Sequence, residues 1–140
     1  MAKHEHLHPH DVAAHEAAHV VTGLLVGLRL KYVLIATPGN QAAGLTLWES
    51  DGSDIGYAIQ YAAGVVWDEM CQQGYSTDDA RLCRKHVDFK ADVMVCKRVA
   101  KNLLLSHKHA HQLVTKALLA ADHYKLTGAD VRALIRGVKE

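Results

Sequence analysis

Two histidines spaced four residues apart, with a glutamate directly after the first, occupy an otherwise apolar stretch near the N-terminus. The segment is His15-Glu16-Ala17-Ala18-His19, and Ala, Val and Leu dominate the residues around it. On an α-helix, positions i and i+4 share one face, so both imidazoles can reach the same point. Polar side chains buried in an apolar helix need partners. Any fold of this chain must therefore bring such partners against this face.

The hydrophobic periodicity predicts a mostly α (α+β) fold, a helical bundle with a small β-hairpin or sheet near the N-terminal third. Asp11 is a candidate N-cap for the first helix, Pro38-Gly39-Asn40 a turn between strands, and Gly74 a helix end. Ser76 or Thr77 can cap the helix that follows. The expected elements are helices over 12–28, 55–73, 87–121 and 129–135, strands over 31–36 and 43–48, and an interruption at 126–128.

Length and charge limit the organisation and the classes of partner. The 140 residues predict a single domain over 11–140, preceded by a flexible tail over 1–10 that carries four alternating histidines. A formal net charge of +1 gives no global field toward nucleic acid or anionic membranes, so we expect neither as a partner. The chain also contains a short run of basic residues, which we interpret as a solvated helix face: Lys97, Arg98, Lys101 and Lys108.

Cysteine usage and the N-terminus bear on the compartment. Cys71, Cys83 and Cys96 include no Cys-x-x-Cys pair, which favours reduced thiols. The stretch from Met1 to His10 has no apolar core of the kind that signal peptides contain. We expect a cytoplasmic protein.

The His-Glu-x-x-His spacing is typical of zinc hydrolases. Two histidines bind Zn²⁺, and the glutamate between them acts as general base toward the attacking water. Such a site needs a third protein ligand. Spacing alone leaves several candidates open: Asp68, Glu69, Asp78, Asp79 and the downstream histidines.

Several further segments make the chain resemble the peptidase domain of the FtsH-type zinc metallopeptidases. They are the motif itself, Lys31 to Trp48, Tyr61 to Glu69, Gly74 to Ala80, and His111 to Asp130, so that the resemblance covers residues 11 to 136. It implies an FtsH-peptidase-like fold and a zinc-dependent peptidase. His15, His19 and Asp79 would then be the metal ligands and Glu16 the catalytic base. Asp78 is the alternative third ligand. Asp79 also has a purely structural interpretation, in which it forms a capping box with Ser76 and binds no metal.

The sequence also departs from that family. Ala18 replaces the usual Gly of the motif, and Val65-Val66-Trp67 replaces Arg-Ala-Ala. An ATPase module and a membrane segment are missing from these 140 residues. The resemblance therefore implies substrates that need no unfolding by an attached ATPase, such as peptides, unfolded protein segments or a specific partner.

Two other interpretations remain open. Two histidines and one carboxylate also describe non-haem iron sites, and the same ligand types hold copper, so a redox enzyme is an alternative. The third interpretation is a non-catalytic binding module with a structural metal, which a groove blocked by Trp67 would favour.

His107 and His111 are again four apart, but no Asp or Glu lies nearby in the sequence. We interpret them as hydrogen-bonded histidines that pack between helices.

Overall fold

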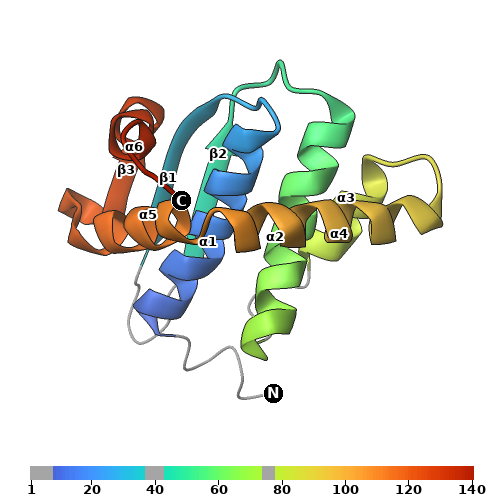
Figure 1. Ribbon diagram of the computed structural model, residues 1–140, viewed down its shortest axis with the longest axis horizontal. Helices are drawn as coiled ribbons and strands as arrows, with labels where there is room; N and C mark the ends of the chain where they lie inside the picture. The colour runs from blue at the N-terminus through green and yellow to red at the C-terminus, as the bar shows by residue number, and fades with distance from the viewer. Residues whose placement is uncertain (1–7, 37–42, 74–77) are drawn as a thin grey trace.

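Helices dominate the part of the chain that the computed structural model describes, residues 8–36, 43–73 and 78–140. As predicted, the fold is mostly helical α+β, with the strands beginning in the N-terminal third (Figure 1). The helices are α1 (Pro9–Leu25), α2 (Asp54–Cys71), α3 (Asp78–Lys85), α4 (Lys90–Ser106), α5 (Lys108–Ala120) and α6 (Gly128–Ile135). The strands are β1 (Leu30–Ala36), β2 (Ala43–Trp48) and β3 (Lys125–Thr127), with a short turn of 3-10 helix over Asp122–Tyr124.

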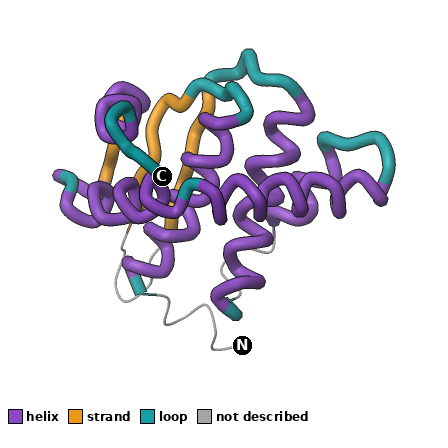
Figure 2. The backbone as a smooth tube through the Cα atoms, in the orientation of Figure 1, coloured by secondary structure: helices purple, strands orange, loops and turns teal. Residues whose placement is uncertain are grey.

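The strands form one antiparallel sheet in the order β2-β1-β3. Val33 in the central strand faces Thr46 of β2 on one side and Leu126 of β3 on the other. Figure 2 shows the strands gathered together and helices making up most of the remaining chain. The β1–β2 pair was predicted, whereas β3 was not. A three-residue strand is too short to have a periodic hydrophobic pattern of its own. Strand β3 forms because its backbone pairs with the edge of β1 that β2 does not occupy.

Helix α1 is the central element of the fold, and all of its residues from Val12 to Gly23 are buried. One side packs into a hydrophobic cluster with β1, β3, α5 and α6. Ala18 joins a second cluster, formed with α2, α3 and α4. Because both sides of the helix are covered, the polar side chains of His15, Glu16 and His19 are held inside the protein.

The predicted helical tract over 87–121 is in fact two helices, α4 and α5, separated at His107. They follow one another nearly end to end across α1 and α2 (Figure 1). The His107 ring Nδ1 lies 2.9 Å from the carbonyl oxygen of Leu103, the acceptor that a continuing α-helix would use for the His107 N–H. That N–H bonds instead to Leu104 O, at 3.3 Å. A side chain that competes for a backbone acceptor in this way interrupts the helix.

Several predicted boundaries also move. Helix α1 begins at Pro9 with His8 as its N-cap, so Asp11 lies in the first turn and the prediction of Asp11 as N-cap is wrong. Proline suits the first helical position because its fixed φ matches the helix and no N–H is lost. Helix α2 ends at Cys71, where Gln72 adopts a left-handed conformation with φ 55°. The predicted turn at 38–40, the helix end at Gly74 and the caps at Ser76 or Thr77 lie outside the described residues.

No helix within the described ranges is both long enough and apolar enough to cross a membrane.

Candidate metal centre

The two motif histidines lie on one face of α1 and point to a common centre. His15 is 1% exposed and His19 is 5% exposed, so both rings are removed from bulk water. Their Nε2 atoms are 3.2 Å apart. The i, i+4 spacing on a helix accounts for this convergence.

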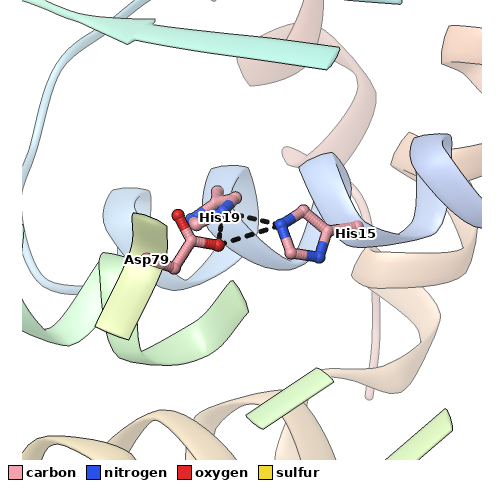
Figure 3. Close-up of side chains that lie close together, drawn as sticks. All are labelled: His15, His19 and Asp79. Atoms are coloured by element: carbon pink, nitrogen blue, oxygen red, sulfur yellow. Dashed lines mark hydrogen bonds and ion pairs between the residues drawn. The ribbon is translucent and has the colours of Figure 1, made fainter. Parts of the chain in front are cut away.

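Asp79 approaches the same centre from the first turn of α3. Its Oδ2 atom lies 3.0 Å from His15 Nε2 and 3.0 Å from His19 Nε2 (Figure 3). Asp79 as a whole residue is 6% exposed. The three side chains therefore form a buried group that can hold a metal ion.

The separations between the donor atoms fit a tetrahedral ion. Zinc–nitrogen and zinc–oxygen distances of about 2.0–2.1 Å give a tetrahedron whose edges are about 3.3–3.4 Å long. The three observed separations, 3.0, 3.0 and 3.2 Å, are only slightly shorter than these edges. A small relaxation of the side chains would admit the ion without moving a helix.

The other nitrogen of each ring is held by a hydrogen bond from behind. His15 Nδ1–H donates to Oδ1 of Asp68 at 2.8 Å, and His19 Nδ1–H donates to the backbone oxygen of Gln60 at 2.7 Å. Histidines that bind metals almost always donate their second N–H to a carboxylate or a carbonyl oxygen, which fixes the tautomer. Both rings thus turn Nε2 to the centre.

The electrostatics of the centre favour positive charge. Burial lowers the pKa of His15, but hydrogen bonds to Asp68 and Asp79 outweigh it and raise that pKa to about 9. The pKa of His19 is raised against the same effect of burial, chiefly by the charge of Asp79. Burial also opposes ionisation of Asp79, yet the two histidines hold its pKa well below the usual range. The negative charges that raise these pKa values also favour a divalent cation, which would take the place of the bound protons.

Glu16 is held by a contact with strand β2. It is 4% exposed, and its Oε1 accepts a hydrogen bond of 2.7 Å from the hydroxyl of Thr46 on β2. A Cβ atom on Gly44 of the same strand would lie 2.6 Å from Glu16 Oε2. The glutamate is therefore oriented by β2, and its charge still contributes to the raised pKa values of His15 and His19.

A second glycine allows the helices to approach each other closely at the centre. A Cβ atom on Gly64 of α2 would lie 2.1 Å from Asp79 Oδ2 and 2.6 Å from His19 Nε2. Any side chain at this position would occupy the space of the Asp79 and His19 side chains. This explains why a glycine, which costs helix stability, stands in the middle of a buried helix.

The remaining candidates for the third ligand lie elsewhere. Asp78 is exposed and 3.6 Å from Arg81, and exposed Glu69 pairs with Lys97 at 2.8 Å. Asp68 contacts His15 on the ring nitrogen opposite Asp79, so it supports the His15 ring rather than joining the three atoms. Within the described ranges, no further group of His, Cys, Asp and Glu side chains has the geometry of a metal site.

His111 has the packing role that the sequence predicted, since its Nε2–H donates to the carbonyl oxygen of Ala14 on α1 at 2.8 Å. His107, between α4 and α5, is hydrogen-bonded to the carbonyl oxygen of Leu103. The Trp67 ring packs against His111, with centroids 4.1 Å apart. Trp67 is thus part of the contact between α2 and α5.

Sequence reasoning missed Gln60, Thr46, Gly44 and Gly64 as parts of the centre. Two of them left a signal. Gln60 is a polar residue in an apolar stretch, and Gly64 is a glycine in the interior of a predicted helix. Thr46 and Gly44 left none, because their role depends on how β2 lies against α1.

A scan against models of known protein families finds no match to this chain, and a search of curated proteins finds none either.

Proposed function

We propose that this protein is a zinc-dependent peptidase that resembles the FtsH-type peptidase domain. The observation that carries the proposal is the convergence of His15 Nε2, His19 Nε2 and Asp79 Oδ2 at separations of 3.0–3.2 Å. Glu16 follows the first of these ligands in the sequence, as it does in zinc hydrolases with this motif.

The chemistry needs a base beside the metal. His15, His19 and Asp79 would hold a Zn²⁺ ion, which would supply polarisation of the scissile carbonyl and a lowered pKa of the attacking water. Glu16 takes the proton of that water and later delivers it to the leaving amine. The hydrogen bond from Thr46 keeps the Glu16 carboxylate in one orientation while it does so.

A peptide is the favoured substrate because of what lies next to Glu16. Strand β2 is an edge of the described sheet, and its Thr46 contacts Glu16 directly. Edge strands can pair with an added extended peptide through backbone hydrogen bonds. A peptide bound along β2 would pass beside the general base, which suits unfolded segments better than folded proteins.

The decisive experiment combines metal analysis with one substitution. Protein purified without added metal should contain about one zinc per chain and cleave an unfolded substrate such as casein. Glu16→Gln should retain the zinc and lose about 100-fold or more in cleavage rate. Glu69→Gln, which changes an exposed glutamate on α2, serves as the matched control and should behave as the wild type. Full activity of Glu16→Gln would overturn the mechanism.

The ligand set also favours one alternative, a non-haem iron or copper redox enzyme. Two histidines and one carboxylate are the donors of such sites. A buried glutamate held at hydrogen-bond distance from Thr46 argues for hydrolysis, since oxygen chemistry does not require that base. Iron or copper in the purified protein, together with oxygen uptake, would support the redox enzyme instead.

A further inference from the structure

A cavity of about 550 Å³ lies between α1, α2, α4 and α5, apart from the metal centre. None of the residues that line it is His15, Glu16, His19 or Asp79. Its volume falls in the range of about 300–1,000 Å³ that is typical of small-molecule sites. The cavity has no role in the proposed hydrolysis.

The inner wall of the cavity is apolar, aromatic and already formed. Trp67 and His111 supply it, with ring centroids 4.1 Å apart and planes tilted by 39°. The His111 ring is fixed by its hydrogen bond to Ala14 O at 2.8 Å. Buried Leu104 and Ala14 also line the cavity. A flat or chain-like apolar group can lie here without first reorganising the protein.

The rim of the cavity is basic. Lys108 and Lys116, both exposed, project from α5, and exposed His10 lies at the start of α1. Asp and Glu are absent from the residues that line the cavity. The two ammonium groups have no acidic partner among these residues. An anionic group of a ligand at the α5 rim would place a negative charge beside these two ammonium groups.

We propose that this cavity binds an amphipathic organic anion, a carboxylate whose aromatic or medium-length alkyl body lies against Trp67. The body fills the apolar wall, and the carboxylate lies at the rim beside Lys108 and Lys116. This assignment rests on the cavity alone and does not depend on a metal or on peptidase activity.

Titrations of the isotope-labelled full chain with octanoate and with 2-naphthoate test the proposal. Both should shift the Trp67 indole resonance and the amide resonances of Ala14, Leu104 and His111 saturably. 1-Octanol, which has the same chain length as octanoate and no charge, should bind about tenfold more weakly than octanoate.

Charge variants separate this site from nonspecific apolar binding. The double variant Lys108→Gln, Lys116→Gln should weaken octanoate about tenfold and leave 1-octanol unchanged. The matched control Lys85→Gln, Lys90→Gln removes two charges from exposed positions outside the cavity and should change neither. The absence of saturable shifts, shifts that map elsewhere, or equal binding of octanoate and 1-octanol would each overturn the proposal.

Discussion

Nδ1 of His15 lies 2.8 Å from Oδ1 of Asp68, on the side of the ring opposite the metal centre. Asp68 comes from α2, and Gln73 donates to the same oxygen from beyond the helix end, at 3.0 Å. The carboxylate thus holds the histidine ring without joining the three converging atoms. Through this contact, α2 controls the direction in which α1 presents its first histidine.

Replacing Asp68 by Asn should weaken zinc binding about 10- to 100-fold, the usual cost of losing such a supporting carboxylate. Asn keeps the shape but removes the charge that orients and polarises the ring. Competition with a chromophoric chelator measures the affinity. Asp78→Asn is the matched control, because Asp78 is an exposed aspartate at the start of α3. Equal zinc affinity in the two variants would show that Asp68 does not support the ligand.

Gly64→Ala should abolish stoichiometric zinc binding, because the added methyl group would overlap Asp79 Oδ2 and His19. Crowding of this kind in a packed core costs about 1–3 kcal/mol of unfolding free energy as well. Zinc content and urea unfolding measure the two effects. Gly137→Ala provides the control, since a Cβ atom there meets nothing within 4 Å. A Gly64→Ala protein that still binds one zinc tightly would contradict the described geometry.

Gly44→Ala should separate catalysis from metal binding. The new Cβ atom would lie 2.4–2.7 Å from the Glu16 side chain, which must then rotate away from Thr46. The three heavy atoms nearest to the added Cβ all belong to Glu16, and none belongs to His15, His19 or Asp79. Zinc content should stay near one per chain while the cleavage rate falls about 100-fold. Ala43→Ser, at an exposed position of the same strand, should leave both unchanged, and loss of zinc from Gly44→Ala would refute this separation.

The i, i+4 spacing of the motif was enough to predict that His15 and His19 converge, because helix geometry alone dictates it. The side chain that meets them could not be derived in this way. Asp79 reaches the centre through the packing of α3 on α2, and spacing left it equivalent to Asp78. Only the family resemblance favoured it. In the structure, Asp78 points to solvent and Asp79 inward, a difference set by the orientation of one short helix.

The secondary structure was predictable where the pattern was local. The pair of strands and most helices follow from hydrophobic periodicity, whereas the break at His107 depends on one ring competing for the Leu103 carbonyl. Strand β3 depends on pairing with β1, more than 90 residues earlier in the chain. Contacts of this kind leave no periodic signal, so their prediction requires the tertiary structure.

Acid should destabilise the protein through His111. Burial lowers the pKa of this histidine, and the hydrogen bond to Ala14 only partly opposes that effect. The unfolded chain, in which a histidine has a pKa of about 6.5, then binds more protons than the folded chain at mildly acidic pH. The contribution of His111 to stability is therefore complete above pH about 6.5 and is lost as the pH falls toward its folded pKa.

Urea unfolding of chelator-treated protein at pH 7.5, 6.5 and 5.5 measures this effect as the difference between variants. His111→Gln should cost about 1–3 kcal/mol at pH 7.5, because packing on Trp67 is lost. Its unfolding free energy should then fall less steeply than that of the wild type as the pH drops. His109→Gln replaces an exposed histidine on the same helix and should retain the wild-type slope. A wild-type slope in His111→Gln would mean that the buried ring does not cause the loss of stability in acid.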